Sequence, residues 1–363
     1  MAKLPLDKFS ISVSESVEDP MWDHFLEGTH LGQYQQSSRW ARYKVSEGWN
    51  PLRYIYSAQE EVIGGLQILC KGTRFGRVGY IPKGPVFPDS GMKTIEHVVG
   101  RLVHLVRENN FSALIVQPPD ECIQFPDILK KNGFLNGKSL GVIDSTLLIP
   151  TSRDFTEIEE GMTRYTRKAI RQSRKRGVSI REGNEQDLVT FFDLMANSSM
   201  RQGARAPNPS NVILFGKLWE SFHQDGHCRL TIAEHEGTVL AGLFCLIYGD
   251  RLTLWKKGWS GRDPDLKPNA ILYAEAISWA HRNGFAWCDF AGLSRDIAEH
   301  LTAGKPLTKA QTQSRDMFNI RFGGIPKLLP EAAIYIKSKV MRHAYSFLNH
   351  LNILNPIIKT KPF

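Results

Sequence analysis

The sequence lacks the features that mark membrane-spanning proteins and several classes of hydrolase. No run of about 18 apolar residues occurs, so no transmembrane helix is predicted. The first residues, MAKLPLDKFSISVSES, have no apolar core of a signal peptide. No HExxH or GxSxG motif is present. The sequence therefore predicts a cytoplasmic protein, and it leaves open peripheral contact with the inner face of the cell membrane.

Cysteine is scarce, and no metal-ligand pattern accompanies it. The five cysteines are an odd number without a CxxC pair, and Cys70 and Cys245 lie in the apolar stretches LQILC and AGLFCLI. Reduced, buried thiols are expected there. His223 and His227 have i,i+4 spacing, but Gly226 interrupts the helix that would bring them together. The sequence therefore predicts no metal site.

Positive charge is what the sequence has in excess. The formal net charge is +9, and the 42% hydrophobic and 23% charged contents are those of a folded protein. Such a surface attracts polyanions, which include nucleic acid, anionic lipid headgroups and phosphorylated substrates. Composition alone does not choose among them.

The charge is concentrated in residues 164–177, where no acidic residue occurs. At 100° per residue these positions predict a helix on which all the cations except Arg176 fall within an arc of roughly 120°. Tyr165, Ala169 and Ile170 lie on the opposite side and predict a packing face. The cationic stripe consists of Arg164, Arg167, Lys168, Arg171, Arg174 and Lys175. It is either a phosphate-binding surface or a solvated helix face.

An internal repeat predicts the architecture. Residues 60–69, EEVIGGLQIL, match residues 237–246, GTVLAGLFCL, since both read as a turn followed by a strand. Residues 106–118, VRENNFSALIVQP, match residues 280–292, AHRNGFAWCDFAG, since in both a helix ends at an Asn-containing turn before an apolar strand. Two matches in the same order with nearly equal gaps predict two copies of one unit.

Within each copy a strand hairpin precedes a helix and a further strand, an order similar to that of GNAT acyltransferases. We therefore expect an α/β (α+β) fold of two tandem GNAT-like domains from an internal duplication, with a C-terminal helical tail. The expected boundaries are 1–152 for the first domain and 153–318 for the second. Residues 319–363 are expected to form a closing strand and a helix that packs on the first domain or on a membrane surface.

Five segments in order resemble the FemABX peptidoglycan aminoacyltransferases, between about residue 33 and residue 326. The first is QSSRWARYKVSEGWNPLRYIY, followed by VGYIPKGPV. The basic helix with GVSIREG comes next, before LKPNAILYAEAISWAHRNGFAWCDFAGL and FNIRFGGIP. Each segment alone is a weak signal, and the ordered set is fairly specific.

The resemblance implies transfer of an amino acid from aminoacyl-tRNA to a stem-peptide amine of a peptidoglycan precursor, with no cofactor beyond the tRNA co-substrate. The precursor is either lipid-linked (lipid II) or nucleotide-linked (UDP-MurNAc-pentapeptide). In this reading the basic helix contacts phosphates of the tRNA or of the precursor.

Substrate-binding residues follow from the same resemblance. Lys44, four residues after Trp40, matches a lysine that contacts precursor phosphates, and Arg201 matches an arginine with the same role. Arg205, one helical turn later, either contacts the same phosphates or forms an ordinary surface ion pair. Trp255 and Tyr273 are candidates for lining the substrate groove, although aromatic residues near strands are more often core.

The catalytic candidates are Phe318, Asn319, Arg321 and Asp289. The family often has a lysine after the motif phenylalanine, assigned to the tetrahedral intermediate, and Asn319 stands there without charge. Arg321 would substitute if strand alternation turned it into the same cleft. Asp289 is either a proton acceptor or a structural acid. Gln117 is a second departure, because related proteins have an acid in a similar setting.

Two other functions fit parts of the sequence. One is a GNAT-like N-acyltransferase that uses another acyl donor on a cell-envelope sugar or lipid, although no good copy of the pyrophosphate-binding Gln/Arg-x-x-Gly-x-Gly/Ala loop is found. The other is a non-catalytic RNA-binding or scaffold protein, which Asn319 and Gln117 would suit. The sequence does not identify the transferred group, the acceptor position or the oligomeric state.

Overall fold

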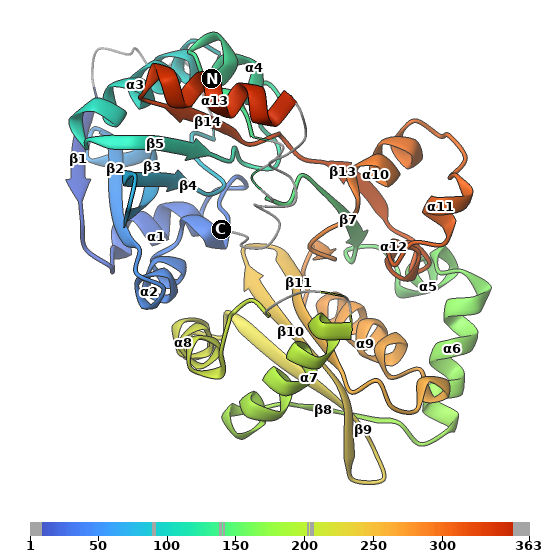
Figure 1. Cartoon of the computed structure of the whole chain (residues 1–363). Coiled ribbons are helices and arrows are strands. Elements are labelled where there is room, and N and C mark those ends of the chain that lie inside the picture. The colour runs from blue at the N-terminus through green and yellow to red at the C-terminus, as the bar shows by residue number, and fades with distance from the viewer. Residues whose placement is uncertain are drawn as a thin grey trace. The chain divides into compact units, whose positions relative to one another are not determined.

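The structure is a computed structural model, and it describes residues 9–88, 92–137, 140, 142–201, 203 and 207–350. The chain forms two compact units. Unit 1 comprises Met1–Val142 together with Leu329–Phe363, and unit 2 comprises Ile143–Leu328. Each unit contains a seven-stranded sheet covered by helices (Figure 1).

The sheet of unit 1 has the strand order β1-β2-β3-β4-β5-β14-β6. Only β4 and β5, which flank helix α3, pair in parallel, and the other neighbours are antiparallel. Its strands are β1 (Ser10–Ser14), β2 (Asn50–Ala58), β3 (Glu61–Thr73), β4 (Gly76–Ile81), β5 (Phe111–Val116), β6 (Leu135–Asn136) and β14 (Ala333–Ile336). Its helices are α1 (Pro20–Glu27), α2 (Ser38–Ser46), α3 (Met92–Glu108), α4 (Phe125–Lys131) and α13 (Lys339–His350).

The sheet of unit 2 repeats this plan in the order β13-β7-β12-β11-β10-β9-β8. Again the one parallel pair, β11 and β12, flanks a helix, here α9. Its strands are β7 (Ser145–Pro150), β8 (Ser179–Glu182), β9 (Cys228–His235), β10 (Thr238–Tyr248), β11 (Arg251–Trp259), β12 (Trp287–Asp289) and β13 (Ile325–Leu328). Its helices are α5 (Phe155–Gly161), α6 (Arg164–Lys175), α7 (Leu188–Arg201), α8 (Val212–His223), α9 (Pro268–Arg282), α10 (Arg295–Thr302), α11 (Lys309–Thr312) and α12 (Asp316–Ile320).

The predicted duplication is present, and it includes an exchange of strands. β1 to β5 in the first sheet correspond in order and direction to β8 to β12 in the second. The next place is taken by β14 in the first sheet and by β7 in the second, each antiparallel to its neighbour. β7 follows the first copy in sequence but completes the second sheet, and β14 follows the second copy but completes the first. We call these two the exchanged strands.

Because of this exchange, the boundaries of the two units differ from the expected domain boundaries. The first boundary lies before β7, near residue 142, and residues 319–328 remain with unit 2. The expected helical tail is in part a strand, because β14 precedes α13. Helix α13 contacts its own unit, where Tyr345 donates a hydrogen bond to the Asn136 carbonyl at 3.2 Å.

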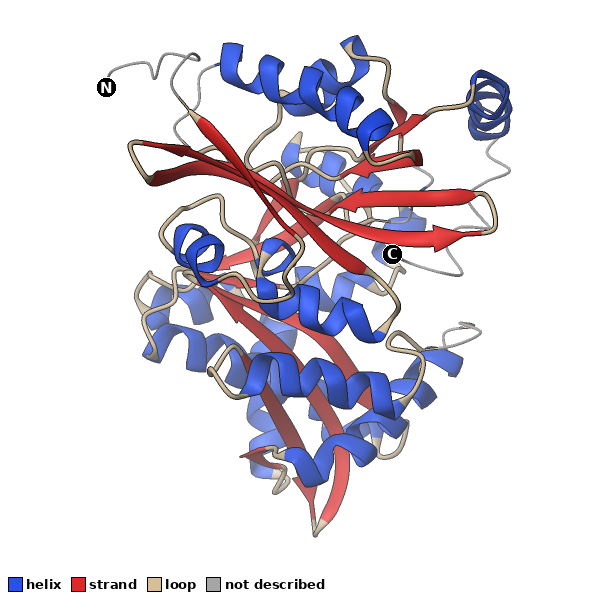
Figure 2. Ribbon diagram, turned by 90° about the vertical axis from the view of Figure 1, so that its left-hand side faces the viewer, coloured by secondary structure: helices blue, strands red, loops and turns tan. Residues whose placement is uncertain are grey.

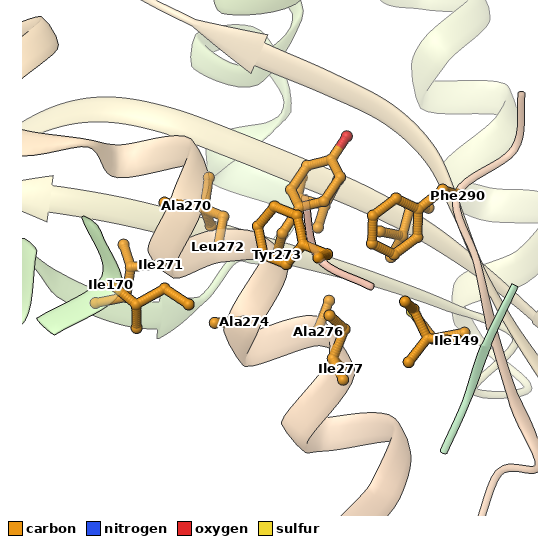
Figure 3. Close-up of a cluster of buried hydrophobic side chains, with 14 of the residues drawn as sticks. Ile149, Ile170, Ala270, Ile271, Leu272, Tyr273, Ala274, Ala276, Ile277 and Phe290 are labelled. Atoms are coloured by element: carbon orange, nitrogen blue, oxygen red, sulfur yellow. The ribbon is translucent and has the colours of Figure 1, made fainter. Parts of the chain in front are cut away.

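The core of unit 2 lies between its sheet and α9. This helix is apolar around most of its circumference, so it buries residues along nearly its whole length. Tyr273 and Ile277 of α9 pack with Phe290 and Ile149 of the sheet side (Figure 3). On the other face, Phe244 of β10 packs against Phe215 of α8. Figure 2 shows the strands of each unit with helices packed against them.

The core of unit 1 is built in the same way. Helix α3 turns an apolar face toward the sheet, where Val99 and Leu102 are fully buried. On the opposite face, Trp22 of α1 is fully buried and lies close to Gly65 of β3. The cysteines carry no disulfide, and burial raises the pKa of the Cys70 thiol to about 11, which keeps it protonated. No helix in the described ranges is both long and apolar enough to cross a bilayer.

Gly65 offers a test of this packing. A Cβ built there would lie 2.6 Å from the Tyr54 carbonyl oxygen and 2.8 Å from the Trp22 ring, so the backbone has little room to adjust. We expect Gly65→Ala to lower the free energy of unfolding by about 1–3 kcal/mol, measured by urea denaturation. Gly72→Ala in the same strand, where no atom lies within 4 Å of the new Cβ, is the control and should change stability little. Equal losses in both variants would contradict the assigned packing.

Candidate functional site

The predicted basic helix is α6, and its cations are solvent-exposed. Thr163 caps the helix, since its side chain accepts a hydrogen bond from the Thr166 amide at 3.3 Å. The buried side consists of Thr166, Ala169, Ile170 and Ser173, which face α9. Five of the predicted cations are exposed: Arg164, Lys168, Arg171, Arg174 and Lys175. The sixth, Arg167, is half-buried, with its guanidinium 3.5 Å from the Glu159 carbonyl.

One expectation for this helix is wrong. The sequence pattern predicts Tyr165 on the packing face, but 58% of the residue is exposed. The Arg321 guanidinium lies 5.0 Å from the centre of its ring, a cation–π contact. Tyr165 therefore belongs to the outer surface at the start of α6, next to the closing motif.

The closing motif FNIRFGGIP is tied to the first turn of α6 through its backbone. The Arg321 carbonyl accepts hydrogen bonds from the Thr163 amide at 2.9 Å and from the Thr166 hydroxyl at 3.0 Å. Gly323 has a φ of +77°, and a Cβ there would overlap the Gly161 carbonyl. A glycine is therefore required where the motif passes the end of α5.

The first part of the motif forms a helix rather than the expected strand, and its last two residues begin strand β13. Phe318 and Asn319 lie in α12, and Arg321 follows directly as its C-cap residue. Alternation along a strand therefore does not orient Arg321, and that part of the prediction is wrong. Its position is fixed instead by the helical turn and by the hydrogen bonds to α6.

A pocket of about 620 Å³ lies within unit 2, in the size range of small-molecule sites. Its walls come from the end of α7, from β11, from the start of α9 and from residues 312–321. Four cationic side chains line it, namely Arg201, Lys257, Arg315 and Arg321. No Asp, Glu, His, Cys or Tyr is among its lining residues in the part of the chain that is described. The pocket is suited to an anionic or electron-rich ligand.

Arg201 is held at the pocket by backbone carbonyls. Its guanidinium donates to the carbonyls of Trp259 and Ser260, the latter at 3.2 Å, and lies 5.4 Å from the Trp259 ring centre. The side chain remains exposed on its outer side. The fork of the guanidinium is thus fixed in orientation, which favours a defined contact with a phosphate or carboxylate.

Lys257 is the residue that sequence analysis missed. Its ammonium lies 4.7 Å from the centre of the Phe318 ring and 5.3 Å from that of Tyr273. Burial lowers the pKa of this ammonium to about 8, Arg315 adds to the lowering, and Asp316 opposes it. The available signal was a pair of lysines inside the otherwise apolar strand LTLWKKGW, since buried lysines are rare.

Two polar atoms in the pocket wall lack a partner. The Asn269 side-chain oxygen and the Ser314 hydroxyl are buried without a hydrogen bond to any described residue. Asn269 belongs to the Pro-Asn segment at the start of α9. Buried polar groups are normally satisfied, so both are candidates for contacting a ligand.

The other predicted residues of unit 2 lie apart from this pocket. Trp255 is in the strand that carries Lys257, but its ring contacts Phe244 on the α8 side of the sheet. Tyr273 is buried beneath the pocket, and Asn319 is half-buried with an unpaired side-chain oxygen but is not among the lining residues. Arg205 lies outside the described residues. The structure thus brings together Arg201, Phe318 and Arg321.

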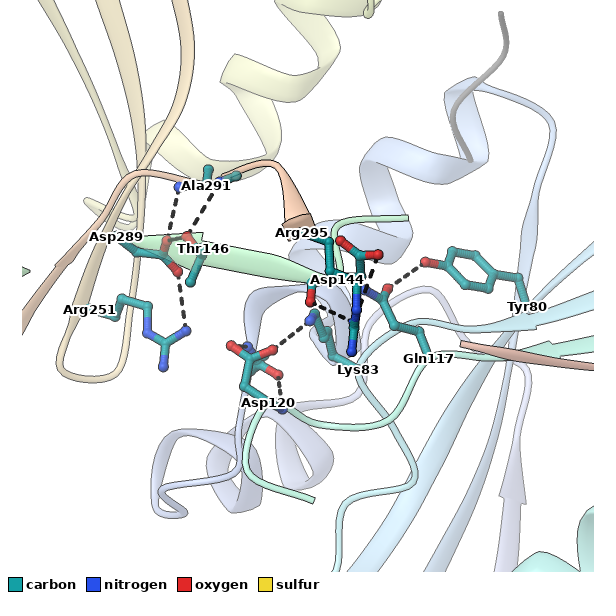
Figure 4. Close-up of polar contacts among 12 residues, drawn as sticks. Tyr80, Lys83, Gln117, Asp120, Asp144, Thr146, Arg251, Asp289, Ala291 and Arg295 are labelled. Carbon is teal, nitrogen blue, oxygen red and sulfur yellow. Dashed lines mark hydrogen bonds and ion pairs between the residues drawn. The ribbon is translucent and has the colours of Figure 1, made fainter. Parts of the chain in front are cut away.

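The Asp289 carboxylate is engaged by neighbouring side-chain and backbone groups, which favours a structural role over a role as proton acceptor. Its carboxylate accepts hydrogen bonds from the Thr146 hydroxyl and, at 2.9 Å, from the Ala291 amide. Arg251 pairs with the second oxygen at 3.3 Å (Figure 4). These contacts hold β12 to β7 and β11, so the acid secures the exchanged strand in its sheet.

In unit 1 the predicted phosphate contact is already paired. The Lys44 ammonium lies 2.6 Å from the Glu47 carboxylate and 5.3 Å from the Trp40 ring centre, and the residue is 6% exposed. Gln117 is buried, and its side-chain oxygen accepts a hydrogen bond from Tyr80 at 2.8 Å. The Lys83–Asp120 ion pair lies nearby in the same unit (Figure 4). A neutral amide at position 117 therefore has a hydrogen-bonding role of its own.

The two histidines considered for metal binding have other contacts. His223 stacks on Trp219 with ring centres 4.0 Å apart, and a ring nitrogen of His227 lies 3.0 Å from the Ile247 carbonyl. The described residues contain no group of three or more His, Cys, Asp or Glu side chains arranged to hold a metal ion.

The role of Asp289 can be tested by stability. We expect Asp289→Asn to lower the free energy of unfolding by about 1–3 kcal/mol, because the charged partner of Arg251 is removed from a buried site. Asp193→Asn removes the same charge from an exposed position on α7 and should change it by less than about 0.5 kcal/mol. Thermal and urea unfolding measure the stability of both variants. Equal stability of the two would contradict the assigned contacts.

Comparison with known families divides the chain as the units do. A model described as the FemAB family matches residues 17–133, in unit 1. A model described as an acetyltransferase (GNAT) domain matches residues 162–298, in unit 2.

Curated relatives include two enzymes named lipid II:glycine glycyltransferase. The protein from Staphylococcus saprophyticus is 24% identical over 233 residues, which cover 61% of this chain and 55% of the relative. The protein from Staphylococcus haemolyticus is 25% identical over 226 residues, covering 59% and 53%. The chain thus spans about half the length of the curated relatives it matches.

Solved structures show the same fold at low sequence identity. The crystal structure of FemX matches with a TM-score of 0.76 at 17% identity, covering 92% of this chain and 99% of that one. A tandem GNAT protein from the clavulanic acid biosynthesis pathway matches with a TM-score of 0.55 at 8% identity, covering 91% and 99%. Together with the ordered motifs, the two family matches relate unit 1 to the FemAB family and unit 2 to GNAT acetyltransferase domains, and the solved structures show that the fold is shared.

Proposed function

We propose that this protein transfers an amino acid from aminoacyl-tRNA to an amine on the stem peptide of a peptidoglycan precursor. The neutral amine attacks the ester carbonyl, and a C–N bond forms. The bond from the carbonyl carbon to the ribose oxygen breaks, and the proton released by the amine is matched by one delivered to the ribose oxygen. The reaction needs stabilisation of a tetrahedral oxyanion and protonation of the leaving group.

The observation that carries the proposal is the continuity of positive charge from α6 to the pocket of unit 2. Arg321 lines the pocket and stacks on Tyr165 at the start of the helix. A tRNA acceptor end has backbone phosphates, unpaired bases and a terminal ester. Exposed cations suit the phosphates, and exposed aromatic rings suit the bases. A ligand of this kind could follow α6 and place its ester in the pocket.

The names of the relatives support the acceptor part of the proposal, since the curated relatives reported above are named lipid II:glycine glycyltransferase. The FemAB match covers unit 1, where Lys44 and Trp40 lie. For Lys44 to bind a precursor phosphate, its ammonium would exchange the Glu47 carboxylate for the phosphate oxygens. A buried ammonium that is already held between a carboxylate and an aromatic ring is oriented for such an exchange.

Transfer is tested by mass spectrometry of the precursor. The protein is incubated with a mixture of charged tRNAs and either lipid II or UDP-MurNAc-pentapeptide. We expect a mass gain of one amino-acid residue, at least tenfold slower in Lys44→Met because methionine cannot pair with a precursor phosphate. Lys217→Met is the matched control, since Lys217 forms the same i,i+3 pair with Glu220 on the exposed face of α8.

The outcomes separate the competing functions. If neither precursor gained mass, aminoacyl transfer to these acceptors would be contradicted. Transfer from another acyl carrier would then indicate the N-acyltransferase alternative. Salt-sensitive tRNA binding without any transfer would indicate a non-catalytic RNA-binding protein.

The role of α6 is tested by salt dependence. We expect Arg171→Ala combined with Arg174→Ala to weaken tRNA binding and to lower the slope of log affinity against log salt by about 1 for each tRNA phosphate that is no longer neutralised. The control is Lys130→Ala combined with Lys131→Ala, which removes the same charge from an exposed helix end in unit 1. Filter binding over a range of salt concentrations measures both. Equal reductions in slope would mean that only net charge matters.

A further inference from the structure

The position of Lys257 depends on an irregularity in β11. In the pairing of β10 with β11, Leu254 lies opposite Cys245, but Lys256 lies opposite Phe244. Trp255 is therefore an extra residue, a β-bulge. Because side chains on a strand alternate between faces, one extra residue reverses the alternation beyond it.

The bulge turns Lys257 toward α9. Lys257 lies opposite Leu243, which belongs to the core cluster of the α9 face. Lys256 lies opposite Phe244 and contacts the ring of Trp255 at 4.6 Å, on the other face. Without the bulge the two lysines would trade faces, so a local backbone feature determines which of them reaches the pocket.

Lys257 differs chemically from the other cations of the pocket. Arg201, Arg315 and Arg321 carry guanidinium groups, which do not release a proton near neutral pH. No carboxylate, imidazole, thiol or phenol is among the described lining residues. Lys257 is therefore the one lining side chain among them that can both give and take a proton in this range.

The ammonium is positioned without being neutralised. In the described part of the chain no hydrogen bond or ion pair engages it, and its close contacts are the faces of Phe318 and Tyr273. Those rings favour a cation and leave its protons free. Burial lowers the pKa of Lys257 to about 8, which makes it a stronger acid than an ordinary lysine while most of it stays charged at pH 7.

We propose that Lys257 is the catalytic acid of the transfer, donating its proton to the leaving ribose oxygen after its charge has stabilised the tetrahedral oxyanion. This inference rests on the proposed function. When the C–O bond breaks, the ribose oxygen takes the ammonium proton. The resulting neutral amine takes the proton from the nitrogen that attacked, so Lys257 is restored and the products are an amide and a free hydroxyl. Asn319, outside the pocket lining and uncharged, does not supply either proton.

The test compares three variants in the transfer assay. We expect Lys257→Met to lower kcat at least 100-fold, in the range found for loss of an acid or an oxyanion donor. Lys257→Arg keeps the charge but cannot release a proton near neutral pH, so it should recover binding of charged tRNA and not kcat. Lys256→Met is the matched control, because it removes the neighbouring lysine, whose pKa burial also lowers to about 8, from outside the pocket. Wild-type kcat for Lys257→Met would overturn the inference.

The pH profile gives a readout that a structural role would not move. In the wild type, kcat should fall as the pH rises through about 8, because Lys257 loses its proton. This decrease of kcat at high pH should be missing in Lys257→Arg. NMR of reductively ¹³C-methylated protein measures the titration directly, without activity. The signal that disappears in Lys257→Arg should titrate near pH 8, and a midpoint above about 10 would count against the proposal.

Hydroxylamine as acceptor separates the two proposals. If neither precursor is modified but the protein still accelerates Lys257-dependent hydroxylaminolysis of charged tRNA, the assigned acceptor fails and the role of Lys257 stands. If transfer to a precursor persists in Lys257→Met, the role of Lys257 fails and the proposed function stands. If the protein accelerates neither reaction, both fail.

Discussion

The hydrogen bonds to the Arg321 carbonyl are the contacts on which the site depends. They join the segment after α12 to the first turn of α6, so that the same residue presents its backbone to the helix and its side chain to the pocket. Gly323 allows the following chain to pass the end of α5 without a clash. Without this attachment the exposed cations of α6 and the pocket would be separate features. With it, charge and stacking surface continue from one to the other.

The pocket combines a guanidinium that is fixed in orientation with an ammonium that can lose its proton. Arg201 is fixed by carbonyl groups of β11 and the turn that follows it, which suits recognition of a charged group in one orientation. Among the described residues Lys257 is held by the aromatic faces of Phe318 and Tyr273, which suits a group that must change its protonation state. Four like charges around one cavity repel each other, and a ligand that brings negative charge relieves that repulsion. The site therefore favours an anionic ligand energetically as well as geometrically.

Much of the fold could be predicted from the sequence, because the repeat and the helix and strand patterns are local. α6, α9 and the hairpin of β2 and β3 lie where periodicity and turn residues put them. The exchanged strands could not be predicted, since an apolar strand carries no mark of which sheet it will join. The bulge at Trp255 was equally hidden, because alternation along LTLWKKGW reads as a regular strand. For that reason Trp255 was expected in the groove and Lys257 was missed, while Arg201 and Arg321 were found through their motifs.

The exchanged strands also bear on how the protein is made. During synthesis the strands β1 to β5 emerge first, but their sheet gains β14 only after all of unit 2 has been translated. Until then the edge of β5 offers unpaired backbone groups, which are a template for wrong pairing with another chain. β7, which follows β5 in the sequence after α4 and β6, is available early as a competitor for that edge. Folding of the first copy is thus coupled to completion of the second, and a nascent chain stalled between the two would be the form most in need of a chaperone.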